Sequence, residues 1–286
     1  MKDLTGRKCL ITGAASGIGR ATALAAARAG TRLVLTDIAA VGLAETVELV
    51  RAGGGEVLDA TPLDVSDYDA VTAWAKRVHD EHGSLDVVMN IAGISAWGTV
   101  ENLEHRHWRS MVEVNLMGPI HIIENFLPPM VRAGRGGHLV NVSSAAGLIA
   151  LPWHAAYSAA KFGLCGISEV LRFDLERHGI GVSLVVPGAV RTPLVDTAQI
   201  VGVDPDDPRL RRLRADFAGR AATPEQVADR IIAGVRRNRY LVHTSTDIRI
   251  AYWFARKFAW PYEQVVRYAS RQFSKLLPAQ GSSVGR

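Results

Sequence analysis

Short apolar runs rich in β-branched residues alternate along the chain with longer segments of helical periodicity. The seven runs are KCLIT, RLVLT, EVLDATPLDV, LDVVMN, GGHLVNVS, GVSLVV and RYLVHT. Segments such as IGRATALAAARAG and YDAVTAWAKRVHDEHG lie between them. Because the runs are nearly continuously apolar, they predict parallel strands buried on both faces. The pattern therefore predicts an α/β fold, a doubly wound parallel sheet of about seven strands with helices on both faces.

A glycine-rich turn, TGAASGIG at residues 12–19, follows the first predicted strand and opens the first helix. In such sheets a ligand binds beyond the carboxyl ends of the strands. Gly13, Gly17 and Gly19 allow a tight turn and a close approach of the backbone to a diphosphate, which a helix N-terminus stabilises. A plain turn is the alternative for these glycines, and their position between strand and helix favours a dinucleotide site.

An acidic residue, Asp37, ends the second predicted strand 18 residues after Gly19. A carboxylate there can accept hydrogen bonds from both ribose hydroxyls of an adenosine, and it repels a 2′-phosphate. Ser16 and Ile38 add no positive charge beside it. The pattern favours NAD over NADP, and a loop aspartate that caps the next helix is the alternative.

A tyrosine and a lysine four residues apart, Tyr157 and Lys161, lie in AAYSAAKFG, and Ser144 precedes the tyrosine by thirteen residues. At this spacing the two side chains project from one side of a helix. The pair alone also fits two helix residues that share a face by chance. A serine at a fixed offset and the glycine turn make a chance arrangement much less frequent.

These pieces resemble the short-chain dehydrogenase/reductases of the single-domain, Rossmann-fold type. The matching segments, over about residues 5–245, are TGAASGIG, LDV (63–65), NIAG (90–93), Asn115 in EVNLMG, Ser144, YSAAK and PGAVRTP (187–193). They stand in the family's order. One departure is Ile91, where the family usually has a second asparagine, while Asn90 is kept.

The resemblance implies a catalytic set of Asn115, Ser144, Tyr157 and Lys161. Tyr157 would be the general base in alcohol oxidation and the acid in carbonyl reduction, and Ser144 would hold the substrate oxygen. Lys161 would hold the ribose of the nicotinamide, and Asn115 would hold a water that passes the proton on. We expect Lys161 and a nicotinamide cation to lower the pKa of Tyr157 from about 10 toward about 7.

The same resemblance implies an NAD-binding set. It consists of Gly13, Ser16, Gly17, Ile18, Gly19, Asp37, Asp64, Val65, Asn90, Ala92, Gly93, Tyr157, Lys161, Pro187, Gly188, Val190 and Thr192.

The domain prediction is a binding and catalytic domain at residues 1–245, with a substrate flap at about 191–220, and a helical extension at 246–286. Trp97, Trp153 and His154 are candidates to line the substrate pocket, with ordinary packing as the alternative. Leu194 and Val195 in the flap favour an apolar substrate.

The extension is basic and aromatic. Residues 249–286 carry seven Arg or Lys and one Glu, and residues 252–273 hold eight aromatic side chains. We expect two helices separated by a break at Pro261, packed beside the active-site entrance or an oligomer interface. Peripheral contact with a membrane is the alternative for such a composition. The family resemblance also implies a homo-oligomer, a dimer or a tetramer.

Composition limits the other partners. The body of the chain is close to neutral despite a net charge of +5, so nucleic-acid binding has no electrostatic basis. Two cysteines and the absence of a signal-like start favour a cytoplasmic protein. His105 and His107 do not face one another on a helix, so we predict no metal site there and a solvated helix start instead.

Three functions remain open. The first is an NAD(H)-dependent oxidoreductase that interconverts a lipophilic secondary alcohol and its ketone. The second is an NADPH-dependent 3-oxoacyl reductase, which fits poorly with Asp37. The third is a regulator that senses a dinucleotide without catalysis, and such proteins typically lose the tyrosine or the lysine that this chain keeps.

Overall fold

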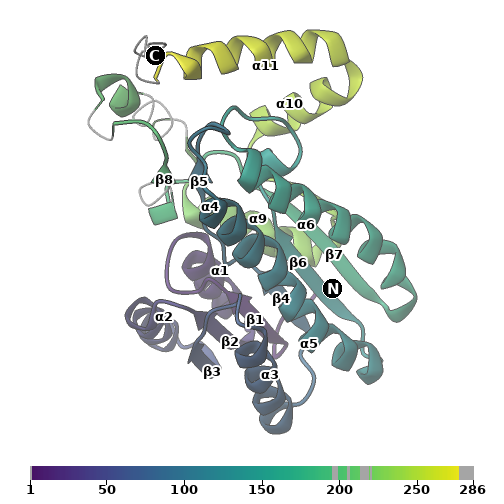
Figure 1. The fold of residues 1–286 in the computed structure, drawn as a ribbon. Helices are drawn as coiled ribbons and strands as arrows, with labels where there is room; N and C mark the ends of the chain where they lie inside the picture. Colours follow the sequence, from purple (N-terminus) through teal and green to yellow (C-terminus); the bar gives the residue numbers. More distant parts are fainter. Residues whose placement is uncertain (1, 195–198, 205–206, 213–218, 220, 277–286) are drawn as a thin grey trace.

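A computed structural model of the chain describes residues 2–194, 199–204, 207–212, 219 and 221–276, and its main feature is a seven-stranded parallel sheet (Figure 1). The strand order is β3-β2-β1-β4-β6-β7-β9. The strands are β1 (Lys8–Thr12), β2 (Arg32–Asp37), β3 (Glu56–Pro62), β4 (Val87–Asn90), β6 (Gly137–Val142), β7 (Ile180–Val186) and β9 (Leu241–His243). Each lies within its predicted run or extends beyond it by one residue, so the predicted fold is confirmed.

Helices cover both faces of this sheet (Figure 1). In β1, Cys9 and Ile11 join the core beneath α1 and α9, while Leu10 joins the core beneath α3 and α5. The alternation explains why the strands are apolar at every position. The helices are α1 (Gly17–Arg28), α2 (Ala40–Ala52), α3 (Tyr68–His82), α4 (His105–Val112), α5 (Gly118–Ala133), α6 (Ala155–Asp174) and α9 (Pro224–Arg236).

The direction of strand addition reverses between β1 and β4. From β1 the chain adds β2 and β3 on one side, and β4, β6, β7 and β9 follow on the other side. The connections therefore diverge at the carboxyl ends of β1 and β4 and leave a crevice there.

The long helical pattern between residues 107 and 131 is interrupted in the structure. A π-helical turn, η1 (Glu113–Met117), separates α4 from α5, and Asn115 lies buried within it. Such turns are rare and often occur at functional sites. The hydrophobic pattern did not predict this one, because a single wider turn barely changes helical periodicity.

Two features of the C-terminal half differ from the sequence prediction. A parallel pair, β5 (Ala96–Trp97) and β8 (Gln199–Ile200), lies outside the main sheet and is too short to produce a pattern. The extension forms α10 (Thr246–Lys257) and α11 (Ala259–Ser274), but the break lies at Phe258. Pro261 does not separate the helices. It lies in the first turn of α11, where its missing N–H is not needed.

A histidine is buried within the sheet. His138 on β6 has no exposed surface, and its Nε2 lies 2.8 Å from Ser183 Oγ on β7. Because Ser183 Oγ donates to Arg239 O, it accepts from Nε2, which leaves the lone pair on Nδ1 without a partner among the described residues. Burial lowers the pKa of His138 to about 4. The His138 imidazole is therefore neutral in the folded state at pH 7.

Folding stability should decrease in mild acid because of His138. Between pH 6.5 and 4 the unfolded chain binds a proton at this residue and the folded chain does not, so the stabilisation present at pH 7 is lost as the pH falls. Going from pH 7 to pH 5 should cost about 2 kcal/mol at this one group. Urea unfolding at both pH values should show that His138→Gln reduces the pH dependence by that amount. An equal pH dependence in both proteins would contradict this assignment.

Candidate functional site

A cleft of about 590 Å³ lies at the carboxyl ends of β1 and β4 and at the start of α1. Its lining includes eleven of the residues predicted to bind the cofactor: Gly13, Ser16, Gly17, Ile18, Gly19, Asp37, Asp64, Val65, Ala92, Gly93 and Thr192. The other six members of that set are not lining residues: Asn90, Tyr157, Lys161, Pro187, Gly188 and Val190. Asn90 is buried and donates from Nδ2 to Asn141 Oδ1, 2.9 Å away.

The glycine turn is too tight for side chains at two positions. Gly13 has a φ of 71°, and a Cβ there would lie 2.8 Å from the backbone of Ala92. A Cβ on Gly19 would lie 1.8 Å from the carbonyl oxygen of Gly13. Ser16 is the N-cap of α1 and its side chain makes no capping hydrogen bond. The helix N-terminus therefore opens into the cleft with backbone N–H groups that suit an anion.

Asp37 presents its carboxylate to the cleft at the end of β2. One oxygen accepts from Ala15 N and the other from Ala39 N, both at 2.9 Å. An ionised carboxylate has about four acceptor positions, so two are left for a ligand. The capping alternative is partly correct, since Ala39 N belongs to the N-cap residue of α2. Among the described residues that line the cleft, none is Arg or Lys.

Tyr157 and Lys161 project from the first turns of α6 into the interior. Their residues are 8% and 4% exposed, and Lys161 Nζ lies 5.7 Å from the centre of the Tyr157 ring. The ammonium donates to Val142 O, 3.1 Å away at the end of β6. A Cβ on Gly93 would lie 3.5 Å from Lys161 Nζ, so the lysine reaches the edge of the cleft.

Burial controls the protonation of this pair. It raises the pKa of Tyr157 to about 12, and a hydrogen bond with Ser144 only partly opposes the shift. Burial also lowers the pKa of Lys161 to about 8. Without a cofactor, burial is the dominant influence on the tyrosine pKa, and the lowering toward about 7 by Lys161 with a nicotinamide cation stays a prediction. Desolvation disfavours the phenolate and the ammonium alike.

The two neighbouring serines have different surroundings. Ser143 is buried, donates from Oγ to Lys161 O at 3.0 Å and lies 3.3 Å from Cys165 Sγ. The Oγ of Ser144 accepts from Ala146 N at 3.2 Å and forms the hydrogen bond with Tyr157. The thirteen-residue offset thus selects the serine that contacts the tyrosine.

Asn115 joins the π-turn to the loop that follows β4. Its Oδ1 accepts from Ile94 N at 3.1 Å, and its Nδ2 donates to Ile94 O at 3.0 Å and to Met111 O at 3.2 Å. A Cβ on Gly93 would lie 2.7 Å from Asn115 Oδ1, so the amide lies against the backbone at the cleft. The side chain is fully buried, and its contacts fix the loop that lines the cleft.

Two histidines near the site are buried rather than solvated. The predicted solvated helix start is wrong for His107, which is buried and accepts at Nδ1 from Glu104 N, 3.0 Å away, as part of a capping box. His154 is stacked on Trp97 with ring centres 4.5 Å apart, and it lies 6.2 Å from the Tyr157 ring. Its Nδ1 lies 2.6 Å from Pro152 O, which can only accept, so Nδ1 carries the proton.

Several residues of the cleft were not identified from the sequence. Thr12 accepts at Oγ1 from the backbone N–H groups of Ile91 and Ala92, each at 3.0 Å, and so holds the loop after β4 against β1. Met111 and Val114 line the cleft from α4 and η1. They were missed because an apolar residue in an amphipathic helix is usually a core residue.

The C-terminal helices contact the loop that precedes α6 (Figure 1). The hydroxyl oxygen of Tyr262 accepts from Ala150 N at 2.7 Å, and the Phe273 ring lies 5.3 Å from the Trp153 ring. Leu276 packs with Val203 and Leu210 from the flap. Residues 195–198, 205–206, 213–218 and 220 of the flap, including Val195, lie outside the described residues.

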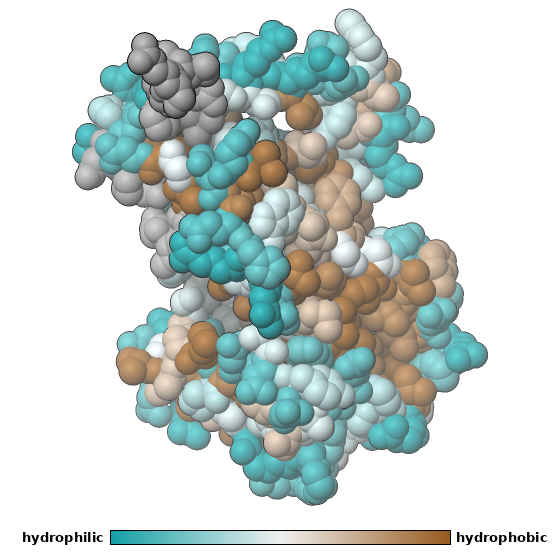
Figure 2. All heavy atoms as spheres, in the orientation of Figure 1, coloured by the Kyte–Doolittle hydropathy of each residue, from teal (hydrophilic) through white to brown (hydrophobic). Residues whose placement is uncertain are grey.

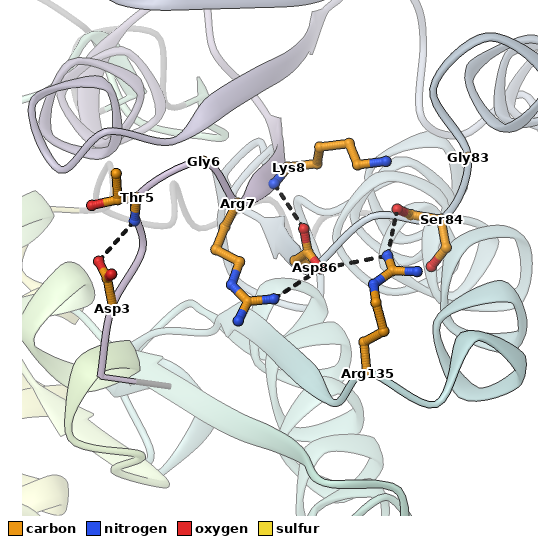
Figure 3. A pocket seen from close by; sticks show the side chains of 9 residues that line it. All are labelled: Asp3, Thr5, Gly6, Arg7, Lys8, Gly83, Ser84, Asp86 and Arg135. Carbon is orange, nitrogen blue, oxygen red and sulfur yellow. Dashed lines mark hydrogen bonds and ion pairs between the residues drawn. The ribbon is translucent and has the colours of Figure 1, made fainter.

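A second, more polar hollow of about 510 Å³ lies at the opposite end of the sheet (Figure 3). Asp86 at its centre accepts from Lys8 N at 3.0 Å and lies 3.4 Å from Arg7 and 3.5 Å from Arg135. The buried carboxylate joins the starts of β1 and β4 to the end of α5, which is a structural role. The hollow contains no residue of the predicted site. Within the described parts of the chain no group of His, Cys, Asp and Glu could hold a metal ion.

Comparison with known proteins identifies the family to which the chain is similar. Residues 7–200 match the family model described as short chain dehydrogenase. The chain is 34% identical over 278 residues to the oxidoreductase named SadH of Mycobacterium tuberculosis, covering 96% of this chain and 98% of the relative. It is 33% identical over 229 residues to the 3-oxoacyl-acyl-carrier-protein reductase FabG of Thermotoga maritima, covering 80% and 90%.

Solved structures agree with this match. A short-chain dehydrogenase/reductase of Burkholderia phymatum in complex with NAD superposes with a TM-score of 0.78 at 29% identity, covering 90% of this chain and 96% of that one. A Beutenbergia cavernae protein with bound NADP superposes with a TM-score of 0.74 at 28% identity, covering 85% and 96%. Together with the glycine turn, Ser144 after β6, and Tyr157 and Lys161 on α6, these matches show that the chain belongs to the short-chain dehydrogenase/reductase family of oxidoreductases.

Proposed function

We propose that this chain interconverts a lipophilic secondary alcohol and its ketone with NAD(H), using Tyr157 as the general acid and base. The observation that carries the proposal is the hydrogen bond between Ser144 and Tyr157, with Lys161 one helical turn away and its Nζ near Gly93 of the cleft. A hydroxyl pair of this kind suits a reaction that moves one proton at a carbinol or carbonyl oxygen.

The residues of the cleft fit a nicotinamide dinucleotide. The start of α1 offers N–H groups to a diphosphate, and Asp37 has acceptor positions left for ribose hydroxyls. Because no Arg or Lys stands among the described cleft residues, a 2′-phosphate would meet only the Asp37 charge, which favours NAD over NADP. The cofactor would supply the hydride and, when oxidised, a positive charge.

Each member of the catalytic set has a role that its contacts support. Tyr157 would donate its proton to a carbonyl oxygen or take one from an alcohol, and Ser144 would hold that oxygen within reach of both hydroxyls. Lys161 would bind ribose hydroxyls, which the proximity of its Nζ to the backbone of Gly93 supports. Asn115 would act as a positioning residue, since its amide holds the loop and the π-turn together.

An apolar lining supports a lipophilic substrate. The Tyr157 ring packs in a cluster with Leu103 and Met111, and Trp108 and Leu151 pack against it. A second cluster, with Leu210 and Leu276, continues toward the C-terminal helices. A substrate that reaches Tyr157 would therefore pass mainly apolar side chains, and burying its hydrocarbon part there would contribute to binding.

The tyrosine prediction concerns proton transfer. Tyr157→Phe should lower kcat by about 10²–10⁴-fold, because the proton-transfer group is removed while the ring and its packing stay. Steady-state assays of NADH formation with a panel of steroid, retinoid, acyl and short-chain alcohols should show the loss. Fluorescence titration with NADH should show nearly unchanged binding. Substantial activity in the variant would refute the role of Tyr157.

The serine prediction uses a matched neighbour. Ser144→Ala should lower kcat strongly, because it removes the hydroxyl that contacts Tyr157. Ser143→Ala removes a hydroxyl of equal size that donates to Lys161 O, so it should mainly lower the thermal midpoint. Both proteins would be compared by kcat and by thermal unfolding. If Ser143→Ala lost more turnover than Ser144→Ala, the assignment would be reversed.

The cofactor prediction concerns Asp37. Asp37→Ala and Asp37→Arg should weaken NAD binding and admit NADP, since a ribose acceptor and a repulsive charge disappear together. The ratio of kcat/KM for NAD and NADP measures the change. A wild-type protein that uses NADPH better than NADH would overturn the proposal and favour 3-oxoacyl reduction, the activity named for FabG. Binding of NAD without turnover of any substrate would favour a dinucleotide-sensing regulator.

A further inference from the structure

The two C-terminal helices each have an inner and an outer face. On α11, Tyr262, Val266, Ala269 and Phe273 follow helical spacing and are at least partly buried. Tyr262 and Phe273 make the contacts with Ala150 and Trp153, so this face is occupied by the body of the protein. The corresponding face of α10 includes Ile248, which lies against Gly188.

The outer faces combine exposed aromatic and aliphatic side chains with cations. Trp260 and Tyr268 on α11 are 71% and 65% exposed, and Ile250 and Trp253 on α10 are 59% and 55% exposed. By helical spacing the outer face of α11 consists of Trp260, Gln264, Arg267, Tyr268, Arg271 and Lys275, and that of α10 of Arg249, Ile250, Trp253, Arg256 and Lys257. Neither set contains an acidic residue.

Part of this positive charge is available to a partner. Arg256 donates to Tyr252, and Arg267 pairs with Glu263 beside the face. Arg249, Lys257 and Arg271 are exposed and make no hydrogen bond or ion pair with the part of the chain that the structure describes. At the corner between the helices, the Phe258 ring lies 5.5 Å from Trp253 and is 44% exposed. Figures 1 and 2 show that these helices form one end of the molecule, where hydrophilic and hydrophobic atoms mix on the surface.

The chemistry of these faces identifies an anionic lipid surface as the partner. Aromatic and aliphatic side chains can enter the headgroup region while Arg and Lys contact anionic headgroups. A second copy docked through the same faces would bring cations against cations, which is unfavourable. A single-stranded nucleic acid would use the cations and aromatics but leaves exposed Ile250 without a role. No described helix is long and apolar enough to cross a membrane, so the contact would lie on the surface.

We propose that the outer faces of α10 and α11 bind the surface of membranes that contain anionic lipids. Because the inner faces contact the loop at residues 150–153, the bound protein would hold the entrance to Tyr157 close to the lipid. The inference is independent of the proposed reaction, since binding can be measured without turnover.

The test is co-sedimentation with vesicles of phosphatidylcholine alone and of equal parts phosphatidylcholine and phosphatidylglycerol. The full chain should sediment with the mixed vesicles, not with phosphatidylcholine alone, and added salt should release it. Combined Arg249→Gln, Lys257→Gln and Arg271→Gln should weaken binding by about fivefold for each cation removed. Trp253→Ser with Trp260→Ser should weaken it further. Circular dichroism would verify that both variants are folded.

A matched control variant distinguishes binding through the outer faces of α10 and α11 from an effect of the protein's total positive charge. Arg28→Gln, Arg132→Gln and Arg236→Gln remove three exposed cations elsewhere that also make no ion pair with the described part of the chain, and they should leave vesicle binding unchanged. An equal loss in the control would overturn the proposal, as would failure of the wild type to bind mixed vesicles. A second copy of the chain would be the partner if two results were found together. The wild type would not bind vesicles, and light scattering would show a smaller oligomer for Trp253→Ser with Trp260→Ser. Displacement of the wild type from vesicles by a short single-stranded DNA would assign them to nucleic acid.

Discussion

The burial of Tyr157 together with Lys161 is the physical constraint on which the proposed chemistry depends. Desolvation disfavours both charged forms, so the pKa of the tyrosine is about 12 and that of the lysine about 8. Burial therefore favours the neutral phenol at neutral pH. In the proposed reaction this form would donate a proton to a carbonyl oxygen, and alcohol oxidation would need added positive charge at the cleft.

The scaffold around this pair uses backbone groups to hold polar side chains in place. Val142 O receives the Lys161 ammonium, Ile94 N and O bind the Asn115 amide, and Thr12 binds two N–H groups of the loop after β4. These contacts join the ends of three parallel strands, β1, β4 and β6, to α6 and the π-turn. Parallel strands bring their carboxyl ends to one edge, so residues distant in sequence meet there. The buried ammonium of Lys161 and the buried amide of Asn115 are satisfied by the same contacts that align them.

The sequence predicted the strands and the glycine turn well because both depend on local requirements. A strand buried on two faces must be apolar throughout, and Gly13 and Gly19 leave no room for a Cβ. What depends on tertiary surroundings was not predictable. His107 lies in a polar segment that predicted a solvated helix start, yet it is buried as part of a capping box. The rise in the pKa of Tyr157 follows from desolvation, which residue spacing does not reveal. The π-turn at Asn115 also depends on tertiary surroundings and was not predicted.

The sequence pattern of the C-terminal helices did not show which of their faces packs on the body of the protein. Their aromatic residues predicted packing, but only the structure distinguishes the face that contacts Ala150 and Trp153 from the face left outside. No residue of α10 or α11 is fully buried, and Leu276 belongs to a small cluster separate from the two main cores. Few buried apolar contacts mean a low free energy for local opening. Opening of these helices should therefore cost less free energy than opening of the sheet around the buried Tyr157–Lys161 pair.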